Sequence, residues 1–314
     1  MTPDPLRLAV VGVGHLGRHH ARLLSSMEGV QLSAVVDIVE ARAREVAAAH
    51  STSALTDFRA LLGKIDAVVV AVPTAIHADL AVPFLERGTP VLVEKPMSRS
   101  LEDADRMRAA AVRGGAMLAV GHTERHNPAV RAALRLAAAP RFIEVHRLSA
   151  FPDRSLDTDV VFDLMIHDLD VVLALVGSEV VSIEAVGVPV LTPKYDIANV
   201  RLRFASGCIA NITASRISRD RVRKIRFFQP DLYVSVDYAS QEVERWRLLR
   251  GGARPEIEGG AVPVERDEPL RLELADFVRA VRDHGEPPLV DGEAGRRALA
   301  LASAIAERME TVVS

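Results

Sequence analysis

Apolar runs of strand length alternate with helical segments over the first 122 residues. The runs are apolar without interruption, which is typical of strands buried on both faces. They are Leu8–Val11, Gln31–Val36, Ile65–Val72, Val91–Glu94 and Met117–Val120, with a weaker one near Ser53. The helical segments between them, rich in alanine, arginine and glutamate, are Leu16–Ser26, Val39–His50, Ile76–Arg87 and Leu101–Arg113. This alternation predicts an α/β domain with a doubly wound parallel sheet of the Rossmann type.

The pattern changes in the second half of the chain. A long apolar helix is expected at Val160–Val176, and strand-like runs follow one another from Val180 to Arg250. Such a succession is typical of a meander in an antiparallel or mixed sheet. The Gly-, Pro- and Glu-rich stretch Gly251–Pro269 is expected to be a loop. Two amphipathic helices, Leu270–His284 and Glu293–Thr311, then close the chain.

The length of 314 residues, with 49% apolar and 26% charged content, is enough for two packed domains. We predict these domains over residues 1–122 and 123–314, with the last helix able to pack back toward the first domain. No apolar run approaches the roughly 20 residues that span a bilayer. The N-terminus also lacks a basic region followed by an apolar one. We therefore expect no membrane association and a cytoplasmic location.

The cysteine content and the net charge restrict the function further. The single cysteine, Cys208, excludes an internal disulfide and a zinc site built on several cysteines, which agrees with a reducing compartment. The formal net charge of −3 gives no electrostatic argument for nucleic-acid binding.

A glycine motif follows the first apolar run directly and precedes a helix. Gly12, Gly14 and Gly17 fit G-x-G-x-x-G, in which the first glycine permits a tight turn, the second lets the backbone approach a pyrophosphate, and the third allows close helix packing. We expect this turn to bind a dinucleotide. The predicted cofactor contacts in the turn are Gly12, Val13, Gly14, His15, Leu16 and Gly17.

Asp37 ends the second strand, 20 residues beyond Gly17. A carboxylate there accepts hydrogen bonds from the adenosine ribose and repels a 2′-phosphate, which favours NAD over NADP. Arg42 and Arg44 follow on the next helix, where we expect them to be solvated.

Two further segments reach the carboxyl edge of the predicted sheet, where ligands of such domains bind. Pro73, Thr74 and His77 follow the fourth strand and are predicted cofactor contacts, although Pro73 is equally suited to break the strand and His77 to lie on the helix surface. Glu94 and Lys95 end the fifth strand and are also placed at the cofactor. A lysine beside the nicotinamide donates a hydrogen bond to a substrate hydroxyl and stabilises a developing alkoxide, while most lysines at strand ends are solvated.

The apolar helix at Val160–Val176 carries an unusual polar stripe. Asp163, His167 and Asp170 are spaced i, i+4 and i+7 and therefore share one face. Burying them among valine and leucine costs several kcal/mol unless partners meet them. One interpretation is a proton-transfer site, in which His167 accepts a hydroxyl proton while Asp163 orients the ring. The other is structural, with Asp163 offsetting the helix dipole and His167 bonded inside the core.

The remaining histidines give weaker signals. His19 and His20 follow the glycine turn, and we expect exposed or capping roles for them. His122 and His126 have a spacing compatible with a metal, but no adjacent third ligand is evident and the Asn127-Pro128 pair interrupts helical geometry. We predict no metal.

Taken together, the glycine turn, Glu94-Lys95-Pro96 and Asp163-x-x-x-His167-x-x-Asp170 resemble the Gfo/Idh/MocA oxidoreductase family. The resemblance extends to Gly121–Pro128 and to Pro288–Glu293. It implies a Rossmann domain followed by an α/β domain with a large open, mostly antiparallel sheet that binds substrate and often makes dimer or tetramer contacts. It also implies that Lys95, Asp163 and His167 form the catalytic group.

Within that family, Asp163–Asp170, Glu124–Pro128 and Ser215–Arg219 through Tyr238 are similar to bacterial enzymes that oxidise the 3-hydroxyl of UDP-N-acetylglucosamine during amino-sugar synthesis, as for lipid A. The substrate contacts that this resemblance implies are Lys95, Arg125, Asn127, Asp163, His167 and Arg216. Arg216 begins a basic run, of which one or two members are expected to neutralise a diphosphate. The others are expected at solvent or at a subunit interface.

Three alternatives remain open from the sequence. The enzyme could oxidise another sugar, a uronate or an inositol. It could instead use transient oxidation to drive glycoside cleavage without net redox change. A non-enzymatic sensor is disfavoured, because a sensor has no need of Lys95, Asp163 and His167 as proton-transfer groups.

Overall fold

A computed structural model describes residues 4–151, 158–250, 255–283 and 286–311. The chain forms two compact units, residues 1–122 with 270–297 and residues 123–269 with 298–314. Residues 270–297, which the sequence analysis places in the second domain, belong to the first unit. The last long helix is therefore shared between the units.

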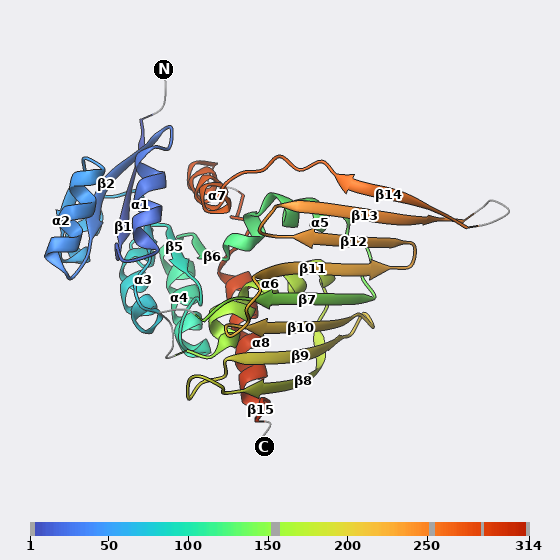
Figure 1. Ribbon diagram of the computed structural model, residues 1–314. Coiled ribbons are helices and arrows are strands. Elements are labelled where there is room, and N and C mark those ends of the chain that lie inside the picture. Colours follow the sequence, from blue (N-terminus) through green and yellow to red (C-terminus); the bar gives the residue numbers. More distant parts are fainter. Residues whose placement is uncertain (1–3, 152–157, 251–254, 284–285, 312–314) are drawn as a thin grey trace. The chain divides into compact units, whose positions relative to one another are not determined.

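The first unit is built on a parallel sheet with the strand order β3-β2-β1-β4-β5-β6 (Figure 1). Its strands in the described residues are β1 (Leu6–Val11), β2 (Val30–Val36), β3 (Ser53–Leu55), β4 (Ala67–Val70), β5 (Val91–Glu94) and β6 (Leu118–Gly121). Every residue of β4, β5 and β6 is buried, as expected where helices cover both faces of a parallel sheet. Because the strands are parallel, their carboxyl ends meet at one edge, where such sheets bind ligands.

Helices cover the two faces of this sheet. They are α1 (Gly17–Ser25), α2 (Glu40–Ala49), α3 (His77–Leu85), α4 (Leu101–Gly114), α7 (Pro269–Asp283) and the start of α8 (Gly292–Glu307), with short 3₁₀ turns η1 (Phe58–Leu61) and η2 (Thr74–Ile76). Leu24 of α1 and Phe277 of α7 share one core with Leu8 and Val10 of β1. The helices α3 and α4 contact each other and the strands β4, β5 and β6. The amphipathic face of α7 thus belongs to the Rossmann core.

The second unit contains a larger sheet with the order β14-β13-β12-β11-β7-β10-β9-β8-β15 (Figure 1). Its strands in the described residues are β7 (Phe142–Leu148), β8 (Val180–Val188), β9 (Ile197–Phe204), β10 (Ile209–Ser215), β11 (Val222–Gln229), β12 (Leu232–Asp237), β13 (Glu242–Leu249), β14 (Glu256–Val262) and β15 (Glu310–Thr311). Neighbouring strands are antiparallel except for the pairs β7–β10 and β8–β15.

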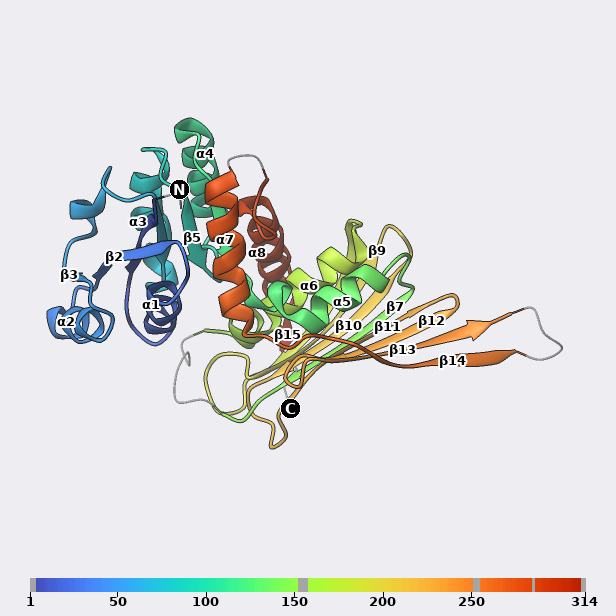
Figure 2. The ribbon, with the colours of Figure 1, turned by 90° about the horizontal axis from the view of Figure 1, so that it is seen from above.

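One face of the large sheet carries the hydrophobic core of this unit. It is covered by η3 (Thr123–His126), α5 (Pro128–Leu136), the π-helix η4 (Val161–Met165), α6 (Ile166–Val176) and the end of α8. Figure 2 shows α5 and α6 along this face. Alternate residues of β9, such as Val200 and Leu202, point into the core, while Asn199 and Arg201 point to the other face. Among the described residues of this unit, no helix covers that second face.

The predicted fold class is confirmed: a parallel Rossmann sheet is followed by an α/β unit with a mostly antiparallel sheet. Several elements differ from the expectation. The sequence analysis omits α5 and β7 and assigns β14 to a loop, and the helix expected at Val160–Val176 begins as a π-helix. The last helix ends at Glu307 and is followed by β15. In the described part of the chain, no helix is both long and apolar enough to cross a membrane.

Candidate active site

In the glycine turn between β1 and α1, packing within the fold requires two of the three glycines but not the third. A Cβ on Gly12 would lie 2.5 Å from the carbonyl oxygen of Ala71, and one on Gly17 would lie 1.8 Å from the carbonyl oxygen of Gly12. Both positions therefore require glycine for packing. A Cβ on Gly14 would meet nothing within 4 Å, and its φ lies outside the left-handed region. The fold does not explain Gly14, whereas a diphosphate that approaches the backbone does.

Asp37 lies directly behind this turn at the end of β2. Its Oδ2 accepts a hydrogen bond from the N–H of Val13 (3.1 Å), and its Oδ1 accepts one from the N–H of Val39 (2.9 Å). The side chain of Arg42 is 42% exposed, as expected, and it also contacts both carboxylate oxygens at 3.2 Å. Arg44, in contrast, forms an exposed pair with Glu40. The carboxylate is thus fixed beside the turn, where it can bind a ribose hydroxyl.

At the carboxyl end of β4, Pro73 is exposed and Thr74 half-buried, while His77 is buried. The ring of His77 faces the carbonyl oxygens of Val72 at 2.9 Å, Pro96 at 3.1 Å and Met97 at 3.2 Å. Burial lowers the pKa of His77 despite these carbonyl groups. The buried ring of His77 therefore connects the segment after β4 with the segment after β5. Of the three predicted cofactor contacts, only Pro73 and Thr74 are accessible to a ligand.

The end of β5 carries Glu94 and Lys95. Lys95 is half-buried, whereas Glu94 is buried and its Oε1 lies 2.7 Å from Nε2 of His20. His20 has no exposed surface. The prediction of an exposed or capping role for His20 is wrong, because its position on α1 faces the sheet rather than solvent.

In the second unit, the catalytic candidates lie where the helix changes its winding. Asp163 belongs to the π-helix η4, and His167 lies one turn later, at the start of α6. Both are half-buried, whereas Asp168 and Asp170 of the same segment are buried. Since π-turns are frequent at functional sites, this local geometry supports the proton-transfer interpretation of Asp163 and His167. Asp170, the third member of the predicted stripe, instead lies 3.2 Å from Nη1 of Arg125.

A buried ionic cluster lies behind His167. Arg147 of β7 forms two hydrogen bonds with Asp168, from Nε to Oδ2 (2.6 Å) and from Nη2 to Oδ1 (2.9 Å), and a third with Glu124 (3.1 Å). Its guanidinium also lies 5.3 Å from the ring centre of Tyr238. Burial acts to lower the pKa of Arg147, but the charges of Asp168 and Glu124 outweigh burial and raise it. This cluster, named the Arg147 cluster here, anchors α6 to the sheet.

Three residues predicted to bind substrate have internal partners. Arg125 pairs with Asp170, and its side chain is 12% exposed. Asn127 is buried, caps α5 through the N–H of Ala129 (3.0 Å) and donates to the carbonyl oxygen of Tyr238 (3.0 Å).

Arg216 is fully buried. Its Nε lies 2.8 Å from Asp196, and its other donors reach the carbonyl oxygen of Thr158 (2.7 Å) and the hydroxyl of Thr192 (3.0 Å). Although burial acts to raise the pKa of Asp196, backbone N–H groups and Arg216 lower it far below its ordinary value. These contacts stabilise the segment between β8 and β9, and we include neither Arg216 nor Asn127 among the substrate contacts proposed for this protein.

Comparison with known proteins agrees with this architecture. Residues 6–122 match the family described as oxidoreductases with an NAD-binding Rossmann fold, and residues 129–230 match the GFO/IDH/MocA C-terminal domain. The chain is 40% identical to UDP-N-acetylglucosamine 3-dehydrogenase of Acidithiobacillus ferrooxidans over 95% of both lengths. The chain belongs to the Gfo/Idh/MocA oxidoreductase family. Like the rest of this family, it is an oxidoreductase.

Solved structures of other dehydrogenases show the same fold. A structure of the Acidithiobacillus ferrooxidans UDP-N-acetylglucosamine 3-dehydrogenase matches with a TM-score of 0.91 at 38% identity, over 98% of both chains. Levoglucosan dehydrogenase in complex with NADH and levoglucosan matches with a TM-score of 0.87 at 18% identity, which is a likeness of fold alone. Myo-inositol 2-dehydrogenase of Thermotoga maritima is 27% identical over 97% of this chain and 96% of its own length.

Other polar residues of this Gfo/Idh/MocA protein form surface ion pairs or are buried. Lys224 and Arg226 of the basic run form surface ion pairs with Asp237 and Glu144. His122 and His126 are buried. In the described ranges, no group of three or more His, Cys, Asp or Glu side chains is placed to hold a metal. That no metal takes part stays a prediction.

The sequence analysis misses His20, Arg147 and Asp168. For His20 a signal exists: position i+3 from Gly17 on a helix that begins at the sheet edge places it on the face turned to the strands. For Arg147, an arginine at a core-facing position of an otherwise alternating strand is the signal, since such a charge requires a buried acid. The acid itself, Asp168, directly follows His167 and does not share the spacing of the predicted stripe, so the sequence analysis does not single it out.

We expect Gly14→Ala to separate ligand binding from folding. A methyl group at Gly14 has free space in the fold but faces the proposed diphosphate site, so the melting temperature should stay unchanged while the affinity for NAD falls at least about tenfold, or about 1.4 kcal/mol. Calorimetric titration with NAD measures this effect. Gly17→Ala is the control and should lower the melting temperature, because its methyl group meets backbone. Unchanged NAD affinity in Gly14→Ala would contradict the assignment.

We expect Arg147→Met to lower the free energy of unfolding by about 3–5 kcal/mol, because it leaves the buried Asp168 and the half-buried Glu124 without their shared cation. Burial already acts to raise the pKa of Asp168, and loss of Arg147 raises it further. The folded variant then binds more protons than the unfolded chain, so its stability falls as the pH rises and its deficit is larger at pH 8 than at pH 5.

Urea unfolding at both pH values measures this deficit. The matched control is Arg113→Met, which removes an exposed ion pair with Glu86 and should cost less than about 1 kcal/mol. A deficit in Arg147→Met as small as that of the control would show that the Arg147 cluster does not anchor α6.

Proposed function

We propose that this protein oxidises a hydroxyl of a sugar nucleotide to a ketone with NAD, and that the substrate is UDP-N-acetylglucosamine, oxidised at its 3-hydroxyl. The observation that carries the dehydrogenase proposal is the glycine at position 14. The fold leaves open space there and does not require a glycine, whereas a bound dinucleotide does. The identity of the substrate is supported by the similarity to UDP-N-acetylglucosamine 3-dehydrogenase over 95% of both chains.

The proposed roles of the residues follow from their chemistry. When bound at the glycine turn, NAD would supply the acceptor for the hydride that leaves the carbon carrying the hydroxyl. The N–H groups of the glycine turn hold the diphosphate, and Lys95 donates a hydrogen bond to the substrate oxygen, where negative charge develops. His167 accepts the hydroxyl proton, and Asp163 orients the imidazole and favours its protonated form. Lys95, Asp163 and His167 are thus proposed to act on one hydroxyl.

The preference for NAD over NADP rests on Asp37. Its carboxylate is held by the N–H groups of Val13 and Val39 and is largely buried, so it cannot swing away from a 2′-phosphate. Arg42 reduces this repulsion by its contact with the carboxylate, but two of the partners of Asp37 are fixed backbone groups. We therefore propose NAD as the cofactor.

The reaction produces a 3-keto sugar nucleotide, whose chemistry suits a following transamination to an amino sugar. We propose that the enzyme acts in amino-sugar synthesis, for lipid A or a polysaccharide, and that it works in the cytoplasm, where sugar nucleotides are the activated donors.

We expect UDP-N-acetylglucosamine with NAD to give NADH, seen as absorbance at 340 nm, and a 3-keto product that a carbonyl trap captures. NADP should support the reaction at least about tenfold more slowly, because of the charge of Asp37. Myo-inositol is the control substrate, since myo-inositol 2-dehydrogenase is among the relatives. Oxidation of myo-inositol alone would refute the sugar-nucleotide proposal, and substrate turnover without NADH would indicate a redox-neutral reaction.

We expect Lys95→Met to lower kcat by about 10²-fold or more, since it removes the cation at the developing alkoxide, while the Kd for NAD changes less than threefold. His167→Asn should lower kcat by about 10²–10⁴-fold through loss of the proton acceptor. Lys64→Met is the control, because Lys64 is exposed on the first unit. Normal kcat in Lys95→Met would remove Lys95 from the catalytic group.

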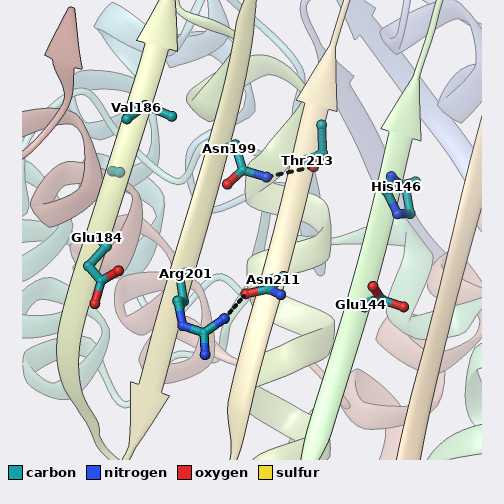
Figure 3. Close-up of a pocket in the computed structure, with 9 residues that line it drawn as sticks. Glu144, His146, Glu184, Val186, Asn199, Arg201, Asn211 and Thr213 are labelled. Carbon is teal, nitrogen blue, oxygen red and sulfur yellow. Dashed lines mark hydrogen bonds between the residues drawn. The ribbon is translucent and has the colours of Figure 1, made fainter. Parts of the chain in front are cut away.

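We also propose that the protein is a homodimer or homotetramer that associates through the open face of the large sheet. The face contains a hollow of about 410 Å³ lined mainly by polar residues of β7, β8, β9 and β10, together with Ala185 and Val186 (Figure 3). Asn199 and Arg201 bond across it to Thr213 (2.9 Å) and Asn211 (3.1 Å). Glu144, Glu184 and Arg201 lie on this face, so two copies can meet with complementary charges.

Aromatic side chains flank the hollow on the same face. The ring centres of Phe142 and Phe228 are 6.0 Å apart, and those of Phe228 and Tyr233 are 5.0 Å apart. Trp246 lies opposite Tyr233 on β13 and is 41% exposed. Tyr, Trp and Phe are enriched in protein interfaces relative to the rest of the surface, which favours this face as the interface.

We expect the double variant Phe228→Glu and Trp246→Glu to elute as a 34.0 kDa monomer in size-exclusion chromatography with light scattering, whereas the wild type elutes at twice or four times that mass. Introduced charges at both aromatic positions would be desolvated in the interface. Val112→Glu, an exposed position on α4, is the control and should keep the wild-type mass. A monomeric wild type, or a double variant with unchanged mass, would contradict this interface.

A further inference from the structure

A buried acid joins the helix after the glycine turn to the strand that ends at Lys95. Glu94 Oε1 lies 2.7 Å from Nε2 of His20 on α1, and Oε2 accepts the backbone N–H of Lys95 (3.2 Å). A carboxylate has no proton to donate, so Nε2 carries the hydrogen of the first bond. The sheet leaves room for the acid at Gly121 of β6, where a Cβ would lie 3.2 Å from Oε2.

Three titratable side chains surround Glu94 at the strand end. His20 faces it from α1, His77 interacts with it electrostatically from α3, and Lys95 follows it in the same turn. Burial acts to raise the pKa of Glu94, but the bond and charge of His20 and the charge of Lys95 outweigh burial and hold it below its ordinary value. Glu94 is thus a buried carboxylate whose negative charge acts on Lys95.

We propose that His20 is a positioning residue for Lys95: it fixes Glu94 as a charged carboxylate, and Glu94 in turn holds the backbone of Lys95 and keeps its side chain in the ammonium form. This inference rests on the role proposed for Lys95 in the reaction. It assigns Lys95 as a hydrogen-bond donor and cation, and it leaves proton acceptance to His167. The helix that follows the dinucleotide turn thereby also sets the charge state of the lysine.

The charge of Lys95 can be measured without substrate or cofactor. The chain has only four lysines, Lys64, Lys95, Lys194 and Lys224, so reductive methylation with ¹³C-formaldehyde gives a small set of NMR signals. Comparison with Lys95→Met assigns the Lys95 signal, and its chemical shift against pH reports the midpoint of its titration. The full-length protein serves for every sample.

In Glu94→Gln, which keeps the size of the side chain but removes its charge, the midpoint for Lys95 should fall by about one pH unit or more. His20→Phe should lower it in the same direction, because Glu94 loses the donor that stabilises its charge. His20→Gln retains an N–H donor and should restore most of the wild-type value. His19→Phe, a neighbouring half-buried histidine on the same helix, is the matched control and should leave the midpoint unchanged.

The kinetic readout is the alkaline limb of the kcat profile, where we expect activity to fall as Lys95 loses its proton. It should move to lower pH in Glu94→Gln and His20→Phe but not in His19→Phe. An unchanged Lys95 midpoint in Glu94→Gln overturns the proposal, as does one unchanged in a folded His20→Phe. If the midpoints shift as expected but the wild type oxidises no sugar nucleotide, the proposed function fails while the positioning role of His20 stands.

Discussion

Charge buried inside apolar elements is the constraint on which both units depend. A buried carboxylate is stable only when a cation or several N–H groups meet it at hydrogen-bond distance. Each unit satisfies this at the segment that carries candidate catalytic residues. In the first, His20 meets Glu94 beside Lys95; in the second, Arg147 meets Asp168 beside His167. Because such partners tolerate little displacement, they fix the backbone from which the neighbouring side chain projects.

Much of the fold follows from local pattern, and the exceptions have physical causes. The uninterrupted apolar runs of the first 122 residues indicate a parallel sheet because burial on both faces leaves no polar side to alternate with. Strand β14 is different. It is an edge strand with two glycines, and a Cβ on Gly259 would lie 2.1 Å from the carbonyl oxygen of Arg245 on β13, so pairing rather than propensity makes it a strand. Likewise, the amphipathic pattern of α7 indicates that one face of this helix packs against a core, but it does not indicate which of the two sheets provides that core.

In the candidate site, too, local sequence pattern predicts only the features that do not depend on distant partners. The glycine turn can be predicted from the sequence because its proposed ligand contacts would be made by backbone groups within six residues. Arg216 and Asn127 are polar residues in suggestive motifs, yet their partners Asp196 and Tyr238 are 20 and 111 residues away, and those partners decide that they are internal. His20 and Glu94 are 74 residues apart. Sequence spacing predicts which side chains share an element, whereas burial and pairing decide which of them remain for a substrate.

The helix around Asp163 departs from regular α-helical winding, and the buried ion pairs of α6 give a reason for this departure. Asp168 and Asp170 are both buried, Asp168 against Arg147 and Asp170 against Arg125, and these two contacts fix the rotation of α6 about its axis. A regular α-helix through Asp163 would then place it on one stripe with His167 and the buried Asp170. The π-turn at Val161–Met165 adds a residue to the turn and changes that phase. Asp163 and His167 remain half-buried while the neighbouring acids are covered, so the turn that departs from regular helix is also the turn with polar groups available for chemistry.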